Sequence, residues 1–332
     1  MIWNHHSREA KFALQAVRAA AGVCQAVRHD AGGASLRKAD TSPVTVADFA
    51  SQALIAGRLA EAFPDDPLVA EEDSRTLESD PATLTQVIER LRTLRPGVDA
   101  GRVRAWIDRG GGQVGDRFWT LDPIDGTKGF LRGDQYVVAL ALIEGGTVVV
   151  AALAAPSLGH DLQPRPSTDG CIVIAVRGDG TWVVRLDGSG ERRVVVSECD
   201  LPSDARLLSS VERAHTDPEQ LARLTRRLGL TAEPIRMDSQ AKYLVIAGGQ
   251  AEMLIRFPPQ DRPDYKEKLW DVAAGLLVVE EAGGRATDVD GRKLDLMAGR
   301  ELRYNRGSLI SNGRLHEAAL DAVRASLGDS PA

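Results

Sequence analysis

The chain has 332 residues, 43% of them hydrophobic and 27% charged, which is an ordinary composition for a soluble globular protein. Its length suits one large domain or two that pack closely. The formal net charge of -6 argues against a surface that binds a nucleic-acid polymer, because such surfaces concentrate basic side chains. A small anionic substrate remains compatible with this charge if a metal ion supplies local positive charge.

The cysteines and the N-terminus favour a reducing compartment. Cys24, Cys171 and Cys199 are far apart, odd in number and form no CxxC pair, which argues against a disulfide framework or a zinc knuckle. Residues 1–28 have no continuous apolar core, since Lys11 and Arg18 interrupt it. They predict neither a signal peptide nor a membrane span. We therefore expect a cytoplasmic protein without a membrane partner.

Two helices and a short strand are predicted at the start of the chain. Apolar side chains recur at helical spacing in residues 8–27 and again in residues 46–63, where Pro64 ends the helix. Residues 68–70 are apolar and predict a strand that ends at Glu71.

The next stretch, residues 74–118, is expected to be peripheral. It contains an amphipathic pattern in residues 82–94 and then the glycine run 110–112. This run lacks the Lys-Ser/Thr pair of a nucleoside-triphosphate loop. We expect it to be a flexible loop.

From residue 117 onward the pattern becomes strand-like. Residues 118–121 predict a strand that leads into Asp122. Two hairpins follow, each made of apolar runs around a glycine turn: residues 136–143 with 147–154, and residues 171–176 with 182–186. The polar segment 161–170 between the hairpins is a plausible seam between domains.

The C-terminal half alternates strand and helix signals. Strands are predicted at residues 207–209, 235–237 and 253–257, and a helix at 217–228. Residues 269–281 are almost wholly apolar and end before Gly283, which predicts a buried helix with a glycine stop.

Asp122 and Asp125 flank Pro123 at the end of the predicted strand, just before Gly126 and Thr127. Both carboxylates could face one space together with the Ile124 carbonyl, and magnesium prefers such oxygen ligands. If Thr127 opens a helix, its free N–H groups also suit a phosphate. By itself, however, this pattern is equally compatible with an ordinary acidic turn.

Two further acidic residues strengthen the hypothesis of a metal site. Glu71 follows an apolar strand, and Asp271 opens the apolar helix of residues 269–281. A charge buried at either place needs a partner. Asp271 could also be a simple helix N-cap, a role that is compatible with metal binding. Four converging carboxylates would suit a two-metal site for phosphoryl transfer, but periodicity alone does not show that they converge.

Several segments of this sequence resemble the inositol monophosphatase superfamily of lithium-sensitive, magnesium-dependent phosphatases. The two segments that match its signatures are residues 122–127 (DPIDGT) and 270–275 (WDVAAG). Further segments resemble the 3'(2'),5'-bisphosphate nucleotidase branch: residues 42–45 (SPVT), 63–66 (FPDD), 122–133 (DPIDGTKGFLRG), 210–215 (SVERAH), 238–243 (DSQAKY) and 265–271 (YKEKLWD). The resemblance covers roughly residues 8–320.

The resemblance implies a role for each matched position. It implies that Mg2+, as two or three ions, is bound by Glu71, Asp122, Asp125, Asp271 and the carbonyl of Ile124. It implies that Asp48 and Thr127 orient and activate the attacking water, while Gly126 and Thr127 donate backbone hydrogen bonds to the phosphate. The residues that it places around the nucleotide are His215, Ser239, Lys242 and Arg256.

Without the matched motifs, the basic residues would be interpreted differently. Lys242 and Arg256 alone would more often be solvated surface charges, since these residue types are mostly exposed. A single His215 would likewise more often be a surface histidine than a ligand. Glu72 and Asp73 are expected at the surface or beside the metal ligands.

The activity implied is magnesium-dependent hydrolysis of the 3'-phosphate of adenosine 3',5'-bisphosphate (PAP), and of its sulfated analogue PAPS, within sulfur metabolism. Two alternatives stay open: an inositol monophosphatase or inositol polyphosphate 1-phosphatase, and a sensor that binds PAP without turnover. The fold implied is the α/β, layered αβαβα sandwich of the inositol monophosphatase/fructose-1,6-bisphosphatase type. We expect a monomer with an α+β domain in residues 1–158 and an α/β domain in residues 159–332.

Overall fold

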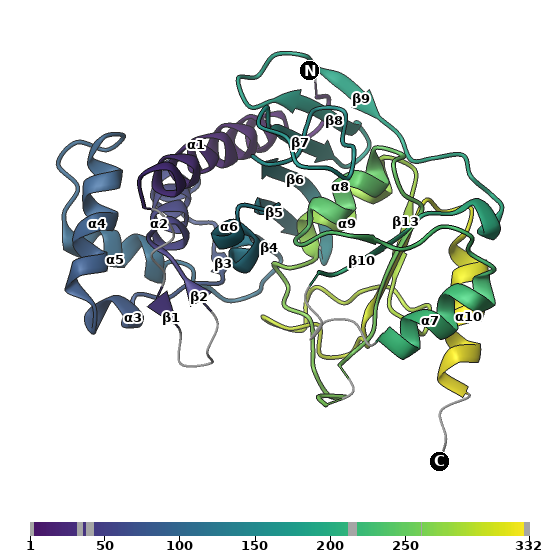
Figure 1. Ribbon diagram of the computed structural model, residues 1–332. Coiled ribbons are helices and arrows are strands. Elements are labelled where there is room, and N and C mark those ends of the chain that lie inside the picture. Colours follow the sequence, from purple (N-terminus) through teal and green to yellow (C-terminus); the bar gives the residue numbers. More distant parts are fainter. Residues whose placement is uncertain (1–2, 32–35, 38–42, 212–217, 260, 329–332) are drawn as a thin grey trace.

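The protein is a layered sandwich in which helices alternate with two β-sheets (Figure 1). The computed structural model describes residues 3–31, 36–37, 43–211, 218–259 and 261–328. Three separate hydrophobic clusters fill the spaces between neighbouring layers. The expected αβαβα architecture is confirmed.

The first sheet has seven strands in the order β3-β4-β5-β6-β7-β8-β9. Only the pair β3 and β4 is parallel, and every later neighbour is antiparallel. The strands are β3 (Leu68–Ala70), β4 (Arg117–Asp125), β5 (Val137–Glu144), β6 (Thr147–Ala155), β7 (Cys171–Val176), β8 (Gly180–Arg185) and β9 (Arg192–Val194). The pairing of β4 with β5 shifts between Asp122 and Asp125, so the acidic end of β4 departs from regular geometry.

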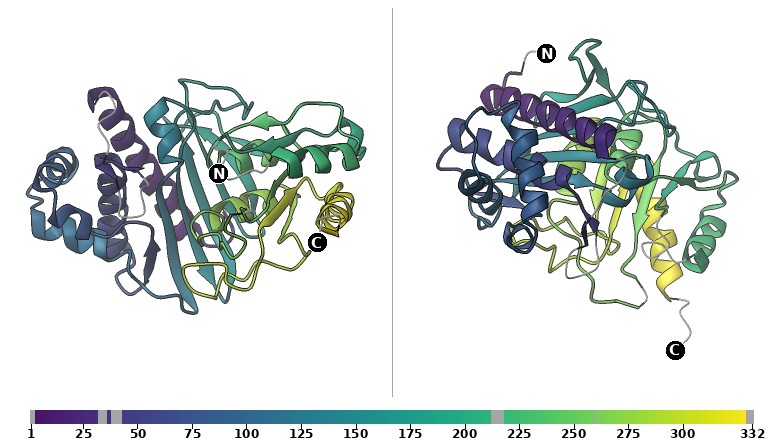
Figure 2. Two further views of the ribbon diagram at one scale, coloured as in Figure 1. Left: turned by 60° about the horizontal axis from the view of Figure 1, so that its bottom comes forward. Right: turned by 60° about the vertical axis from the view of Figure 1, so that its left-hand side comes forward.

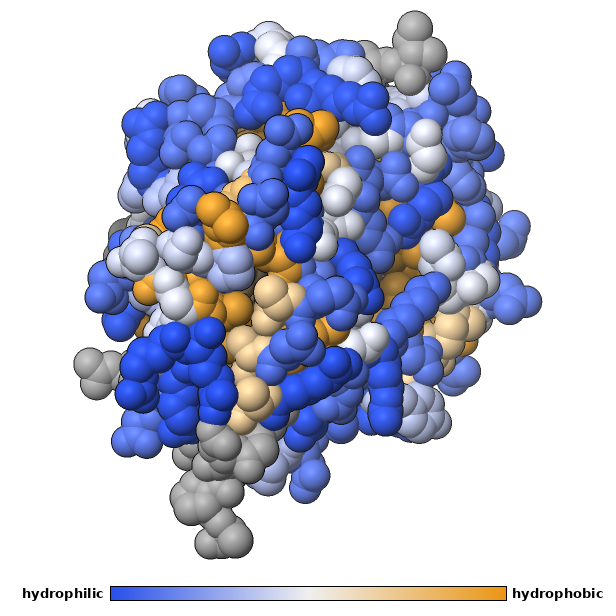
Figure 3. All heavy atoms as spheres, turned by 90° about the vertical axis from the view of Figure 1, so that its right-hand side faces the viewer, coloured by the Kyte–Doolittle hydropathy of each residue, from blue (hydrophilic) through white to orange (hydrophobic). Residues whose placement is uncertain are grey.

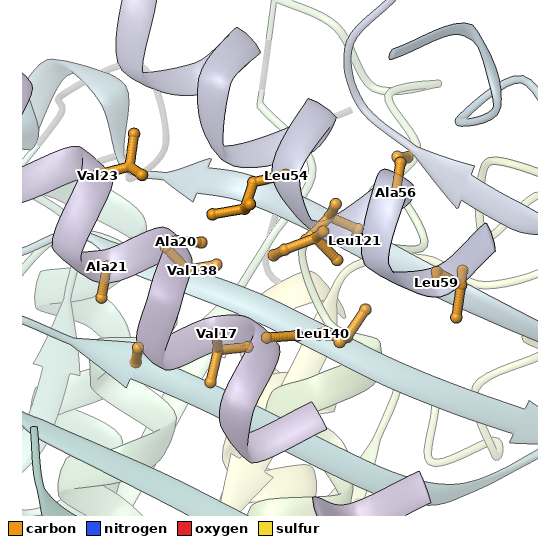
Figure 4. Packing of buried hydrophobic residues seen from close by; sticks show 14 of the residues in the cluster. Val17, Ala20, Ala21, Val23, Leu54, Ala56, Leu59, Leu121, Val138 and Leu140 are labelled. Atoms are coloured by element: carbon orange, nitrogen blue, oxygen red, sulfur yellow. The ribbon is translucent and has the colours of Figure 1, made fainter. Parts of the chain in front are cut away.

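Two long helices cover the outer face of this sheet. Helices α1 (Ser7–Ala31) and α2 (Val46–Ala62) direct small and branched apolar side chains onto β4 and β5, with Val17 and Leu54 among them (Figure 4). Thr45 caps α2, because its hydroxyl accepts from the backbone N–H of Asp48 while the Asp48 carboxylate accepts from the backbone of Thr45. This capping box fixes Asp48 in the first turn of the helix.

The smaller elements beside α1 and α2 form one end of the molecule, opposite the end that carries α7 and α10 (Figure 2). They are the short strands β1 (Leu36–Arg37) and β2 (Pro43–Val44) and the helices α3 (Arg75–Glu78), α4 (Pro81–Arg92) and α5 (Ala100–Asp108). Asp80 and Asp99 cap α4 and α5 by accepting backbone hydrogen bonds.

The second sheet has five strands in the order β11-β10-β12-β14-β13. Strand β10 is parallel to β11 and β12, whereas β14 is antiparallel to β12 and β13. The strands are β10 (Leu207–Ser209), β11 (Ile235–Arg236), β12 (Met253–Arg256), β13 (Arg285–Thr287) and β14 (Ser308–Ser311).

The remaining helices complete the layers. Helices α8 (Ala241–Ala247) and α9 (Ala273–Glu281) lie between the two sheets, and their side chains belong to the cluster that both sheets share. Helices α7 (Pro218–Leu228) and α10 (His316–Gly328) cover the outer face of the second sheet. That side of the molecule is largely hydrophilic, with apolar residues interspersed (Figure 3). The short helix α6 (Thr127–Arg132) and the 3-10 helix η1 (Pro202–Asp204) lie in connections.

The structure differs from the sequence predictions in three places. Strands β7 to β9 continue the first sheet, so this sheet crosses the expected boundary between residues 158 and 159. The glycine run 110–112 is not a flexible loop, because Gly110 and Gly112 exchange backbone hydrogen bonds with β3. Helix α9 begins at Ala273 with Val272 as its N-cap, so Asp271 precedes the helix and does not cap it. No helix of the described residues is long and apolar enough to cross a membrane.

Candidate active site

A pocket of about 270 Å³ opens between the end of β4 and the second sheet. Its lining carries charges of both signs. The acidic residues are Glu71, Asp125, Asp238 and Asp271, and the basic residues are Lys128, Lys242 and Arg256. Asp48 and Asp122 are buried and do not line it.

The carboxylates in and beside the pocket repel one another. Burial raises the pKa of Asp122 well above its usual value, and the charges of Glu71, Asp125 and Asp271 raise it further. Burial and the nearby Asp125 raise the pKa of Asp271 to about 8. Acidic groups gathered in this way without matching cations are destabilising, and a divalent cation would remove both the repulsion and the burial cost. The donor chemistry therefore fits magnesium, which prefers carboxylate oxygens.

Glu71, Asp125 and Asp271 line the same pocket, but they do not surround a single metal position. Among the residues that the structure describes, no three Asp, Glu, His or Cys side chains are grouped closely enough to hold one ion. Coordination by several of them therefore requires some side chains to rotate. The backbone N–H of Ile124 donates to the Asp122 carboxylate at 3.1 Å, and the Ile124 carbonyl accepts from the Thr127 hydroxyl at 3.3 Å.

Asp48 and Thr127 come together as the resemblance implies. The Thr127 hydroxyl lies 3.3 Å from the Asp48 carboxylate and 3.3 Å from the Ile124 carbonyl. Asp48 is fully buried, and its other oxygen accepts from the backbone and the hydroxyl of Thr45 at 2.8 and 2.6 Å. These hydrogen bonds hold the α2 N-terminus against the start of α6.

Gly126 allows the pocket wall to come close to the second half of the chain. Its φ of +91° favours glycine, and a Cβ at this position would lie 3.0 Å from the Cβ of Ser239. Ser239 itself has a φ of +62°, a conformation that non-glycine residues adopt rarely. The strained Ser239 backbone and Gly126 thus meet at one wall of the pocket.

Of the two cations predicted to bind nucleotide, Lys242 is buried and Arg256 is half-buried. Lys242 is 6% exposed, and its ammonium donates to the Met237 carbonyl at 3.2 Å. Burial and the nearby Arg256 lower the pKa of Lys242 to about 8. The Arg256 Nε lies 3.0 Å from the Glu267 carboxylate, and this partner keeps the guanidinium in the pocket wall. Neither residue is a solvated surface charge. His215 lies outside the described residues.

Sequence reasoning assigned no role to Gln240, which the structure places at the centre of the site. Its backbone N–H donates to Asp125 at 2.7 Å. Its side-chain amide donates to the Trp270 carbonyl at 2.9 Å and accepts from the Gly275 backbone at 3.0 Å. Gln240 therefore connects the acidic turn to the segment that carries Asp271. The matched segment 238–243 contains this residue, but a single glutamine in a sequence has no spacing that reveals such contacts.

Glu72 is also more buried than the sequence suggested, at 4% exposed. Its backbone is held from both sides by Gln52, whose amide accepts from the Glu72 N–H at 3.0 Å and donates to the Glu72 carbonyl at 2.6 Å. Lys128, Tyr243 and Tyr265 are pocket residues that the sequence reasoning did not single out.

Comparison with known proteins gives a consistent family. The model of the inositol monophosphatase family matches residues 4–327. The 3'(2'),5'-bisphosphate nucleotidase of Schizosaccharomyces pombe is 38% identical, with 97% of both chains covered. The protein of the same name from Oryza sativa is 39% identical over 97% of this chain and 95% of that relative.

Solved structures share the fold at lower identity. The IMPase of Thermotoga maritima superposes with a TM-score of 0.66 at 20% identity, covering 97% of this chain and 98% of that one. CysQ from Bacteroides thetaiotaomicron, a bacterial member of the inositol monophosphatase family, gives a TM-score of 0.62 at 20% identity, with 93% and 98% covered. At this identity the likeness concerns the fold alone.

Proposed function

The chain belongs to the inositol monophosphatase family, and from this premise we propose that it hydrolyses the 3'-phosphate of PAP to give AMP and phosphate. PAPS, which carries the same 3'-phosphate, is the second substrate that we propose. Relatives that are 38% and 39% identical over nearly their whole length carry the name 3'(2'),5'-bisphosphate nucleotidase. The reaction class is phosphoric monoester hydrolysis in all these cases.

The observation that carries the proposal is that one pocket contains both carboxylates and cations. Glu71, Asp125 and Asp271 line it together with Lys242 and Arg256. A bisphosphate substrate needs both kinds of charge. The phosphate that is hydrolysed needs an acidic site that holds a cation, and the phosphate that remains on the nucleotide needs fixed cations. A monophosphate would leave the buried Lys242 and the half-buried Arg256 without an anionic partner from the substrate.

We propose Mg2+ as the cofactor, held by Glu71, Asp122, Asp125, Asp271 and the Ile124 carbonyl. The mutual repulsion of the buried carboxylates supports this assignment. When bound, the ion lowers the pKa of a water and neutralises charge on the phosphate. Lithium, as a competing cation, is expected to inhibit at the same position.

The protein's own part in the reaction begins with Thr127. Its hydroxyl has one proton to donate and lies at equal distance from the Asp48 carboxylate and the Ile124 carbonyl. When the proton points to Asp48, the oxygen keeps lone pairs that can accept from the attacking water and orient it. The carboxylate is held by Thr45 and cannot turn away. Gly126 and Thr127 are proposed to donate backbone hydrogen bonds to the phosphate.

The second half of the chain is proposed to hold the nucleotide. Ser239, Lys242 and Arg256 line the pocket, and His215 is assigned to the same role by resemblance. The residues assigned to metal, water and nucleotide come from a single chain, so we propose a monomer as the active unit. Its three free thiols fit a cytoplasmic protein.

The test is phosphate release from PAP, PAPS, inositol 1,4-bisphosphate and inositol monophosphate at saturating Mg2+. We expect kcat/KM to be highest for PAP or PAPS. A preference for either inositol phosphate would instead support an inositol phosphatase. Tight PAP binding without phosphate release from any of the four would support a sensor.

A further inference from the structure

Arg300 joins segments of the chain that carry two of the proposed metal ligands. One guanidinium nitrogen donates to the carbonyl of Gly110 at 3.0 Å, and another donates to the carbonyl of Ala70. Ala70 is the last residue of β3 and immediately precedes Glu71. The side chain thus contacts a residue 230 positions earlier in the sequence, directly before the pocket residue Glu71.

The same residue also holds the segment before Asp271. Its backbone carbonyl accepts from the Leu269 N–H at 3.0 Å, and its guanidinium lies 4.7 Å from the centre of the Trp270 ring. The next residue, Glu301, forms a bridge with Lys268, and their side chains pair at 2.6 Å. Residues 300–301 therefore fix the strand-like approach to Asp271 by main chain and by stacking.

The end of β3 offers a rigid surface for this contact. The backbone N–H of Ala70 donates to the Gly110 carbonyl at 2.9 Å, so Arg300 binds two carbonyls that already belong to one paired unit. A Cβ on Gly110 would lie 2.6 Å from the Gln52 amide and 2.9 Å from the Cβ of Ala70. The glycine run thus permits close packing that a side chain would prevent, which explains these glycines without any role in binding nucleotide.

Arg300 also interacts electrostatically with acidic residues at the site. Burial lowers the pKa of its guanidinium, and the carboxylates of Asp73 and Glu71 act in the opposite direction. Arg300 therefore adds positive charge beside the acidic segment that contains Glu71 and Asp73. Planar guanidinium geometry suits simultaneous contact with two carbonyls and one ring face better than a lysine would.

We propose that Arg300 is a positioning residue that sets the separation of the Glu71 and Asp271 carboxylates and thereby the affinity of the site for divalent cations. It touches neither substrate nor reacting atoms in this role and acts only through the two flanking segments. The inference rests on the proposed function insofar as those carboxylates bind metal, and it extends that function to a residue outside the matched motifs.

The experiment compares Arg300→Met and Arg300→Lys with wild type in the full chain. Mn2+ binding is measured by electron paramagnetic resonance, in parallel with the Mg2+ dependence of phosphate release from PAP. We expect Arg300→Met to weaken Mn2+ binding about ten-fold and to raise the Mg2+ concentration for half-maximal rate by a similar factor. Arg300→Lys should change both the Mn2+ affinity and the Mg2+ concentration for half-maximal rate less than Arg300→Met does. The KM for PAP at saturating Mg2+ should change little.

Arg109→Met is the matched control, because Arg109 also donates to main-chain carbonyls, those of Phe63, Pro64 and Asp66. It should lower the melting temperature while leaving Mn2+ affinity at the wild-type value. The proposal is overturned if Arg300→Met remains folded and binds Mn2+ like wild type, or if Arg109→Met weakens Mn2+ binding equally. If wild type binds Mn2+ yet releases no phosphate from PAP, the proposed function fails, and the binding comparison still decides the role of Arg300.

Discussion

At the scale of single residues, the Thr127 hydroxyl connects Asp48, which is proposed to help activate water, with the turn that is proposed to bind metal. It belongs to the first turn of α6, faces the capped N-terminus of α2 and shares the pocket wall with Gly126. Its single proton has two acceptors, the Asp48 carboxylate and the Ile124 carbonyl. Only when this proton points to Asp48 can the hydroxyl pass it to a carboxylate while its oxygen takes a proton from water.

Removing this hydroxyl should slow turnover more than it weakens substrate binding. We expect Thr127→Ala to lower kcat by at least about 100-fold with little change in KM, since general-base assistance is worth roughly that much. Thr127→Ser keeps the hydroxyl and should retain most of the rate. Steady-state kinetics on PAP measure both variants. Equal rates for the alanine and serine variants would rule out a role for the hydroxyl.

Lys242 and Arg256 should discriminate between substrates with one and two phosphates. We expect Lys242→Ala and Arg256→Ala to lower kcat/KM for PAP by roughly 10- to 100-fold, the value of a charge-assisted hydrogen bond. A monophosphate such as 3'-AMP should lose much less. Phosphate release from the two nucleotides provides the comparison, and equal losses on both would contradict the assignment of these residues to the remaining 5'-phosphate.

At the scale of elements, helices α8 and α9 pack closely together next to the pocket, which Tyr243 of α8 lines. Gly275 lies in α9, and a Cβ there would come within 2.5 Å of the Tyr243 ring on α8. We expect Gly275→Ala to lower the free energy of unfolding by about 1–3 kcal/mol, the usual cost of overpacking a core. Thermal or urea unfolding measures the change.

Gly22→Ala is the matched control for this effect. Gly22 lies in the interior of α1, and no atom lies within 4 Å of the place that a Cβ would occupy, so an alanine meets no neighbour there. We expect it to raise the free energy of unfolding by about 0.4–1 kcal/mol, because alanine restricts the unfolded chain. If both glycine variants changed stability alike, steric contact with Tyr243 would not be the cause.

His316 joins β13, β14 and α10 and should make stability depend on pH. Its fully buried ring contacts the hydroxyls of Thr287 and Ser311 at 3.0 and 2.8 Å. Burial, with Arg285 nearby, lowers its pKa to about 4. The unfolded chain binds a proton near pH 6.5 and the folded chain does not until about pH 4, so stability should fall as pH falls across this window, by about 3 kcal/mol in total.

Urea unfolding between pH 7 and pH 4 measures this slope in wild type and in His316→Gln. Glutamine does not titrate in this range, so the variant should lose the part of the slope that His316 contributes. An unchanged slope in the variant would assign the acid sensitivity to other groups.

The elements that sequence patterns revealed are those with one apolar face or a clear hairpin turn. Helices α1 and α2 and the strand pairs β5–β6 and β7–β8 are of this kind, and the structure confirms them. Helix α8 is buried on every side and short, so its residues show no amphipathic period. The apolar residues just before α9 continued its pattern and predicted a start four residues too early.

Contacts to the main chain explain the site residues that the sequence did not reveal. Gln240 and Arg300 bind backbone groups of distant segments. Every residue carries such groups, so the sequence does not show which residue will be the partner. The metal and catalytic assignments came from matched motifs, and only the fold shows that Asp48 and Thr127 are close in space. The burial of Lys242 likewise depends on packing between layers.

At the scale of the whole molecule, the layered architecture explains why the pocket draws on both ends of the chain. The end of β4 supplies the acidic turn, strand β12 of the second sheet supplies Arg256, and the connections around that sheet supply Ser239 and Asp271. Gln240 connects its segment to Asp125, and Arg300 connects its segment to Ala70, the residue before Glu71. Chemistry and nucleotide binding are therefore expected to depend on the same arrangement of the two sheets.

The most direct test of the central claim is the identity of the product formed from PAP as Mg2+ is titrated, with Asp122→Asn as the comparison. We predict that phosphate and 5'-AMP appear in equal amounts, only in the presence of Mg2+, and that Asp122→Asn abolishes their release while still binding PAP. Formation of 3'-AMP, phosphate release without a divalent cation, or near-normal turnover in Asp122→Asn would contradict this claim.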